Sequence, residues 1–192
     1  MDLKIRGFDF SQITVDNEGY IYALNVFYAG ICSNNWTEGL WPHSSRLLER
    51  YELCPRKFAY DYQITNMGNE LTLATFCHEN GHMICSFPDL YDYGAESNGA
   101  GYFCLMSGGN VDQKNPTQLS AYLKYKSGWG KRVTPIVRVM RATIEAGEND
   151  FYIYAKNQAE YFIIENRNNT GRDRALPSSG LAIWHVDELT AR

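Results

Sequence analysis

The sequence predicts an α+β fold in which a helix that carries two histidines is followed by a β-rich C-terminal part. Residues 71–85 place apolar side chains and both histidines on one helical stripe. Residues 20–29 and 58–64 are rich in the β-branched and aromatic side chains that are typical of strands. We expect residues 1–135 to contain the helix and residues 136–192 to form the β-rich part of the same domain.

The composition is that of a globular protein with a buried core. Of the 192 residues, 44% are hydrophobic and 21% are charged, which are ordinary values for such a domain. The formal net charge of −4 argues against a general nucleic-acid-binding surface. The chain has no run of about 20 apolar residues, so we expect no membrane span, and its first residues lack the apolar core of a signal peptide. None of these properties indicates an oligomeric state.

The N-terminal third is expected to contain a polar turn and two strands. The run from Asp16 to Gly19 weakly resembles a calcium loop, but the outer ligand positions would fall on Thr14 and Tyr22. We therefore favour an Asx turn, and calcium stays possible but unsupported. Residues 20–29 are expected to form a buried central strand and residues 58–64 a second strand. His43, in the long loop between them, is expected to be a surface or packed histidine and not a ligand.

The helix that follows is expected to begin near Asn69, a candidate N-cap, and to end before Pro88. Its inward-facing stripe contains Leu71, Ala74, His78, His82 and Cys85. Residues 86–115 show no periodicity and are expected to be irregular. A second helix is predicted over residues 116–126, ending at Gly128. The strands predicted after it are 136–145, 151–156, 160–166 and 181–187, with a hairpin across the turn at 147–150.

The segment from His78 to His82 reads H-E-x-x-H and indicates a metal site. Residues four apart on a helix lie on one face, so His78 and His82 can both reach a single Zn²⁺ at roughly 2.0–2.1 Å. Glu79 points about 100° away from His78, beside the metal, where it can take a proton from a water molecule. The motif therefore predicts a zinc site with Glu79 as the general base.

A catalytic zinc needs a third protein ligand, which the motif does not supply. The metzincin spacing is excluded, because it would place the third ligand at Pro88 and a glycine at Cys85. Glu96 is the first choice, because it lies far enough along the chain for the backbone to reverse. The alternatives are Asp92, Asp89 and the thiols Cys85 and Cys104. A thiolate ligand would indicate a structural site and not a catalytic one.

Eight short segments of the chain also match, in the same order, the motifs of one known protein family. The family's motifs H-E-x-G-H, G-L-P-D-L-Y-D and W-x-L-M-S-G-G correspond to residues 78–82, 88–92 and 105–109. Its Y-A-G, W-P-H-S, G-W, E-Y-F-x-x-E-N-R and G-L-x-I-W-H-x-D motifs correspond to residues 27–30, 41–44, 128–129, 160–167 and 180–187. The chain thus resembles the immune inhibitor A family of secreted metallopeptidases over nearly its whole length.

The resemblance implies a zincin-like fold, with an active-site helix under a mixed sheet, in residues 1–135. It implies zinc-dependent endopeptidase activity on protein or peptide substrates outside the cell. It also implies a glutamate after the two histidines as the third ligand, which agrees with Glu96. The methionine of L-M-S-G-G, here Met106, would form a Met-turn, an apolar floor under the zinc.

The chain departs from the family pattern in two places. Cys85-Ser86-Phe87 replaces a small-glycine-leucine run, and Phe103 stands where a tryptophan is expected. The family's propeptide, upstream strands and downstream domains have no counterpart here, so we expect a domain truncated at both ends. Two alternatives stay open: a catalytically inactive zincin-fold module that binds protein or glycan, or a structural metal domain that uses Cys77, Cys85 or Cys104.

Overall fold

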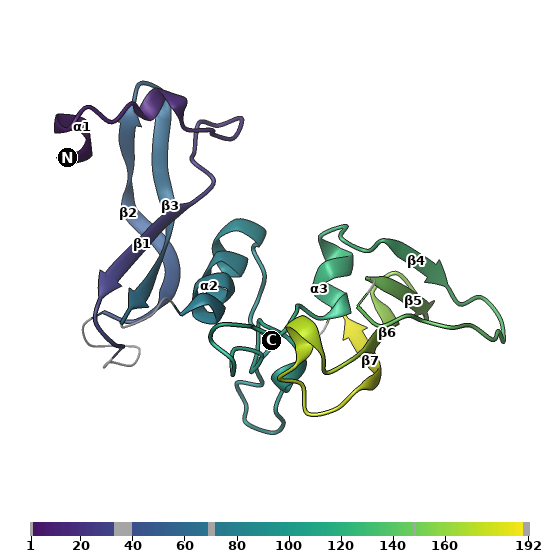
Figure 1. The fold of residues 1–192 in the computed structure, drawn as a ribbon. Coiled ribbons are helices and arrows are strands. Elements are labelled where there is room, and N and C mark those ends of the chain that lie inside the picture. Colours follow the sequence, from purple (N-terminus) through teal and green to yellow (C-terminus); the bar gives the residue numbers. More distant parts are fainter. Residues whose placement is uncertain (1, 33–39, 69–71, 148, 190–192) are drawn as a thin grey trace. The chain divides into compact units, whose positions relative to one another are not determined.

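A computed structural model describes residues 2–32, 40–68, 72–147 and 149–189 (Figure 1). Backbone contacts divide the chain into two compact units, Met1–Pro88 and Asp89–Arg192. Each unit combines one sheet with few helices, so the chain is a mixed α and β protein. The zincin-like arrangement stays a prediction, and so does the subdivision between residues 135 and 136. No helix in the described part of the chain is long and apolar enough to cross a membrane.

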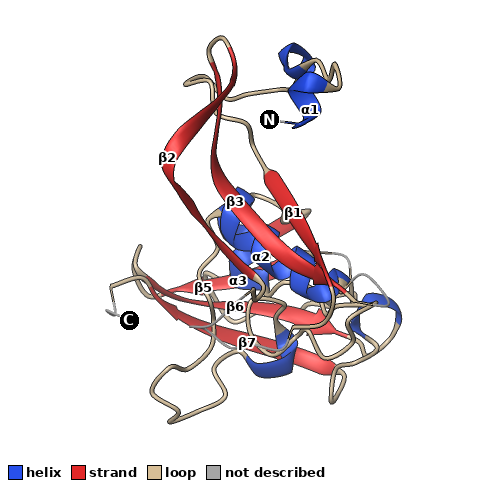
Figure 2. Ribbon diagram, turned by 90° about the vertical axis from the view of Figure 1, so that its left-hand side faces the viewer, coloured by secondary structure: helices blue, strands red, loops and turns tan. Residues whose placement is uncertain are grey.

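The first unit is built on a three-stranded sheet (Figure 2). It contains α1 (Asp2–Ile5), η1 (Phe10–Gln12), β1 (Leu24–Ala29), β2 (His43–Cys54), β3 (Lys57–Met67) and α2 (Leu73–Cys85). The strand order is β1-β3-β2, in which β1 is parallel and β2 antiparallel to β3. A two-residue turn joins β2 to β3, and Arg56 at this turn has a positive φ of 66°. The sheet is therefore a hairpin to which β1 adds from a distance along the chain.

The structure corrects the predicted strand assignment in this unit. The central strand is β3, which agrees with the second predicted strand, whereas β1 lies at an edge and is largely exposed. The apolar composition of residues 20–29 suggested the opposite. The strand β2 was not predicted, because most of its side chains are polar and it exposes most of them. Asp16 forms the expected Asx turn, since its Oδ1 accepts hydrogen bonds of 2.9 Å from the backbone N–H groups of Glu18 and Tyr20.

Helix α2 closes the first unit. It begins at Leu73 with Thr72 in the N-cap position, whereas the predicted N-cap Asn69 lies outside the described residues. The helix packs against β3 and β2, with Ala74 fully buried. The ring of Phe76 stacks on that of Phe27 in β1, with a centroid distance of 5.4 Å. These contacts hold one face of the helix against the sheet.

The second unit contains a four-stranded sheet of order β4-β5-β6-β7. Its elements are η2 (Gly101–Phe103), α3 (Ala121–Lys126), β4 (Arg132–Pro135), β5 (Asp150–Ala155), β6 (Glu160–Arg167), η3 (Gly171–Asp173) and β7 (Gly180–Asp187). The core packs α3 against one face of β5, β6 and β7 through Ala121, Phe151, Tyr161, Ile163 and Val186. The three last predicted strands are thus confirmed, and residues 86–100 are irregular, as expected.

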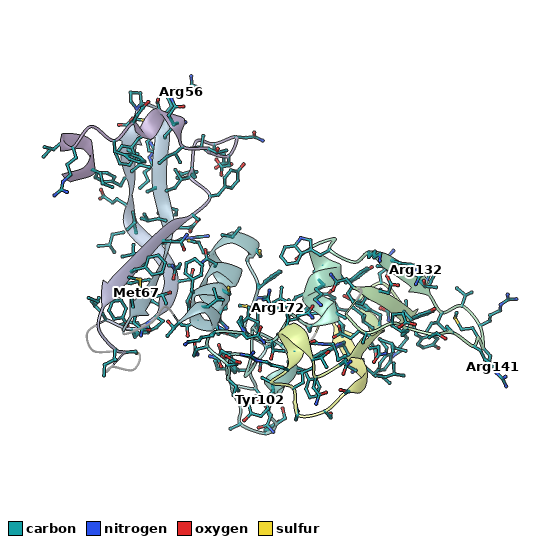
Figure 3. The ribbon with its side chains drawn as sticks, in the orientation of Figure 1. Arg56, Met67, Tyr102, Arg132, Arg141 and Arg172 are labelled. Atoms are coloured by element: carbon teal, nitrogen blue, oxygen red, sulfur yellow. The ribbon has the colours of Figure 1, made fainter. Side chains whose placement is uncertain are left out.

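Two other predictions for the second unit are wrong. Residues 136–145 do not form a strand, and no hairpin crosses the turn at 147–150, because β4 precedes that segment and runs parallel to β5. The connecting segment projects from the sheet, with Arg141 near its tip (Figure 3). Helix α3 begins only at Ala121, because Thr117 N donates to Gly109 O and Gln118 O accepts from Leu105 N instead of entering a helix. The helix stops before Gly128, as predicted.

A buried ion network ties these elements together. The guanidinium of Arg167 donates two hydrogen bonds of 2.8 and 2.9 Å to Asp173 and one of 3.2 Å to Glu165. It also donates a bond of 3.0 Å to the carbonyl of Phe103. Glu165 Oε1 accepts from Ala121 N at the start of α3 and from Trp184 Nε1 in β7. The Arg167, Glu165 and Asp173 side chains are only 3–4% exposed. The hydrogen bonds and opposite charges within the network therefore offset the cost of removing these charges from water.

We predict that Arg167→Ala lowers the free energy of unfolding by about 3–5 kcal/mol, because it leaves two buried carboxylates without their cation. The matched control is Arg174→Ala, since the side chain of Arg174 is 59% exposed in its pair with Asp112. That control should cost less than about 1 kcal/mol. Urea unfolding followed by circular dichroism measures both, and equal effects of the two changes would contradict the prediction.

Candidate metal centre

Helix α2 brings the two motif histidines together on one face of the helix. Their Nε2 atoms lie 3.1 Å apart, and their rings meet edge to face with a centroid distance of 4.7 Å. His78 and Glu79 are buried, and His82 is half-buried. This arrangement follows from the spacing of four, which the helical turn converts into adjacency on one face. The predicted pairing of His78 with His82 is therefore present.

The end of the helix orients His82. Ser86 takes a left-handed conformation (φ 52°, ψ 33°), and the chain turns back so that Phe87 N donates to Gly81 O at 3.1 Å. The Phe87 carbonyl then lies 2.6 Å from His82 Nδ1. Because a carbonyl can only accept, Nδ1 must hold the hydrogen, and Nε2 of the neutral ring carries the lone pair. This is the tautomer that a metal-binding histidine needs at Nε2.

A carboxylate completes the group directly after the turn. Asp89 follows Pro88, and single ligand atoms of His78, His82 and Asp89 all lie within 4.8 Å of one another. Asp89 Oδ2 accepts a hydrogen bond of 2.6 Å from the Tyr93 hydroxyl. Such a bond to a metal-binding carboxylate orients it and holds it in place. Asp89 is half-buried, so this orientation is also supported by packing.

The group fits a zinc ion in its donor chemistry. Two nitrogens at 2.0–2.1 Å from a tetrahedral zinc lie about 3.3 Å apart, close to the 3.1 Å between the two Nε2 atoms. Two imidazoles and one carboxylate form the donor set of several catalytic zinc sites, in which a fourth position stays open for water. In the described part of the chain, this is the only cluster of three or more such side chains that could hold a metal.

The other predicted carboxylate ligands lie on the loop that follows. Asp92 accepts hydrogen bonds from Gly94 N through Oδ1 and from Ser97 N through Oδ2, so both oxygens serve the loop. Hydrogen bonds from Ser97, and a further one from Gly94, hold the pKa of Asp92 below its ordinary value. Glu96 is exposed near the tip of the same loop, whose base closes through Ala100 N and Leu90 O at 2.9 Å. Glu96 does not belong to the described cluster. Its role as the third ligand stays a prediction.

The thiols are poor candidates for metal ligands here. Burial raises the pKa of Cys85 and that of Cys104, which is fully buried and accepts a hydrogen bond from Ser120 N at 3.3 Å. A raised pKa disfavours the thiolate, which is the form that binds zinc. No cysteine belongs to the described cluster of His78, His82 and Asp89. These facts count against the structural metal domain as an alternative.

Met106 lies in a tight turn of the second unit. The backbone N–H groups of Ser107 and Gly109 both donate to Cys104 O at 3.0 Å, and Met106 is fully buried. A Cβ on Gly109 would lie 2.5 Å from Cys104 O, so only glycine fits there. Leu90 N donates to Met106 O at 2.6 Å, which ties this turn to the residue after Asp89. The role of Met106 as an apolar floor under the metal stays a prediction.

The two remaining histidines lie outside the cluster, and His43 begins strand β2 instead of lying in the loop before it. His43 Nδ1 lies 2.8 Å from Trp41 O, and its Nε2 lies 3.0 Å from the Tyr62 hydroxyl. His185 stacks on Phe162 with a centroid distance of 4.6 Å. Tyr102 is exposed on the surface of the second unit (Figure 3).

Sequence reasoning missed two contributors to the site. The Phe87 carbonyl leaves no mark in the sequence, because any residue supplies a backbone carbonyl at that position. Tyr93 could have been found from its spacing of four after Asp89 in the run D-L-Y-D-Y, but the abundance of tyrosine in this chain hides that signal.

One protein-family model matches the chain. The model of the immune inhibitor A peptidase M6 catalytic domain matches residues 16–134, which is more than half of the chain. The matched span contains β1, β2, β3, α2 and the turn around Met106. No curated protein matches the chain.

We predict that Asp89→Ala weakens Zn²⁺ binding by about a hundredfold, because a third ligand is lost. The matched control, Glu96→Ala, removes an exposed carboxylate from the same loop and should change the affinity by less than about threefold. Competition with a chromophoric zinc chelator measures both dissociation constants. A large loss in Glu96→Ala together with no loss in Asp89→Ala would instead support Glu96 as the ligand.

Proposed function

The chain belongs to the immune inhibitor A peptidase M6 family, a family of metallopeptidases, and from this we propose that it is a zinc-dependent endopeptidase that cleaves protein substrates. The observation that carries the proposal is the cluster of His78, His82 and Asp89 beside the buried carboxylate of Glu79. His78, His82 and Asp89 would hold the zinc. Glu79 would act as the general base.

The proposed roles follow from the position of each side chain on α2. When bound at such a site, zinc supplies a Lewis acid and lowers the pKa of a coordinated water toward about 7. Glu79 follows His78 directly, so its carboxylate lies beside the cluster and is free of the ligand role. It takes the proton of the attacking water as the water oxygen bonds to the scissile carbonyl carbon. It then delivers this proton to the leaving nitrogen as the C–N bond breaks.

The burial of Glu79 supports this role. The residue is only 9% exposed, so its carboxylate is largely shielded from bulk water beside the cluster. The Phe87 carbonyl and Tyr93 would act through other residues, since they orient His82 and Asp89 respectively. We further propose that the protein acts outside the cell, as is typical of the family.

We predict that Glu79→Gln lowers kcat for casein hydrolysis by about 10²–10⁴-fold and leaves zinc binding intact, because the amide keeps the shape and loses the base. The matched control is Glu49→Gln, which removes one charge from the exposed surface of β2. Hydrolysis of labelled casein, with and without a chelator, measures the effect. If zinc-loaded wild-type protein shows no chelator-sensitive cleavage, the proposal fails, and a catalytically inactive module that binds protein or glycan becomes the better account.

A further inference from the structure

The connection between β4 and β5 projects from the second unit as an exposed arm. Ile136 N donates to a carbonyl of β5 at 2.7 Å, and Ile144 O accepts a hydrogen bond of 2.8 Å from Asn166 Nδ2 in β6. Both isoleucines are half-buried, so the two ends of the connection are fixed on the sheet. All residues between them are exposed, and Arg141 lies near the tip (Figure 3). We call residues 137–143 the arm.

The large apolar side chains of the arm face water. Val137 is 84% exposed, Val139 is fully exposed, and Met140 is 42% exposed. Apolar side chains that are scattered singly over a surface are ordinary, but here three occur within four consecutive residues of a projecting segment. Such a group, with polar residues around it, is typical of a site that contacts another molecule or a membrane. Covering the two valines would remove apolar surface from water, which is favourable.

The charge of the arm is positive, although that of the whole chain is negative. Arg138 and Arg141 lie among the apolar residues, and neither forms an ion pair with another residue of the described part of the chain. The wider segment 131–144 contains no acidic residue, in a chain whose formal net charge is −4. Its basic residues are Lys131, Arg132, Arg138 and Arg141. Because arginine stays charged at any ordinary pH, the arm presents a permanent positive charge beside exposed apolar groups.

An anionic lipid bilayer suits this combination of shape and charge better than a folded protein does. The arm projects, so a protein partner would need an apolar groove of matching shape that is also lined by acidic side chains. The surface of a bilayer instead adapts to a projecting group. Apolar side chains then enter the boundary of the acyl chains, while the guanidinium groups stay at the level of the lipid phosphates. Guanidinium also matches the geometry of a phosphate, to which it donates two parallel hydrogen bonds.

We propose that the arm is a membrane-docking site, which inserts Val137 and Val139 into the surface of an anionic bilayer and places Arg138 and Arg141 on its phosphates. The contact is peripheral, because seven residues are too few to cross a bilayer. It involves no side chain of the metal cluster. The proposal therefore stands or fails independently of the proposed peptidase activity.

The first experiment measures the contribution of charge, by sedimentation of the full chain with vesicles of phosphatidylcholine that contain about one-third phosphatidylglycerol. The wild-type protein should bind these vesicles more tightly than pure phosphatidylcholine, and added salt should weaken the binding. Arg138→Gln combined with Arg141→Gln should weaken it about twenty-fivefold, since each arginine near an anionic surface contributes about fivefold. The matched control combines Arg56→Gln and Arg172→Gln, which give the same net charge from exposed positions elsewhere (Figure 3). It should weaken binding less than about threefold.

The second experiment measures insertion with the same vesicles. Val137→Ser combined with Val139→Ser should weaken binding about tenfold, because less apolar surface leaves water. The control Leu48→Ser removes a fully exposed apolar side chain from β2 and should leave binding unchanged. Val139→Trp should strengthen binding, since tryptophan favours the membrane–water interface, and its added fluorescence should be quenched by brominated lipids. Such a gain cannot arise from a variant that fails to fold.

Several outcomes would overturn the proposal. One is the absence of binding to the anionic vesicles at low salt, and another is an equal loss in the variant of the two arm arginines and in its control. A loss in that arginine variant together with unchanged binding by the valine variant would show an electrostatic contact without insertion, and would also reject it. Polyglutamate in place of the vesicles tests an acidic protein partner, and binding as tight as that to the vesicles would reject the bilayer as the ligand.

Discussion

The hydrogen bond between His82 Nδ1 and the Phe87 carbonyl is the interaction on which the candidate site depends. It forms because α2 ends at Cys85 and Ser86 turns the chain back in a left-handed conformation. The carbonyl decides which nitrogen of His82 holds the hydrogen, and so directs the Nε2 lone pair toward His78. The same reversal brings Asp89 into the cluster, one residue after Pro88. One backbone turn thus controls both the tautomer and the choice of a nearby carboxylate.

The long irregular segment at the start of the second unit is held in place by polar contacts to buried groups and not by helices or strands. The Cys104 carbonyl accepts two N–H groups of the turn around Met106, and Arg167 binds the neighbouring Phe103 carbonyl. Leu90 N in turn binds the Met106 carbonyl. The segment that carries Asp89 is therefore connected through the backbone of this turn to the buried ion network of Arg167, Glu165 and Asp173. Buried charges are expensive to desolvate, and here their hydrogen bonds to backbone groups offset that cost.

Membership of the peptidase family and the side chains around His78 and His82 are both consistent with the proposed metallopeptidase activity. A metal needs neutral imidazoles and a carboxylate, and a peptide bond needs a base that is not itself a ligand. Helix α2 supplies both within five residues, and the loop after it supplies the carboxylate.

The features that sequence reasoning predicted correctly depend on short spacings. His78 and His82 are adjacent because any helix brings residues four apart together, and Asp16 forms its turn with amides two and four residues away. Strands β5, β6 and β7 were recognised from their own composition. The errors concern partners that lie far apart in the chain. The apolar residues 20–29 gave no sign that β1 would lie at an edge, and β4 pairs in parallel with β5 across a long connection.

By itself, therefore, the sequence determined the H-E-x-x-H motif, the helix that carries it, the carboxylate of Glu79 beside the histidines and the family. Only the tertiary structure decided which strand is central, and which carboxylate joins the histidines in one cluster. The physical reason is the same in both cases. Strand order and ligand geometry depend on backbone groups, such as the Phe87 carbonyl and the free edge of β7, that every residue type carries alike. Spacing can reveal side chains that share a helix face, but it cannot reveal where the chain reverses.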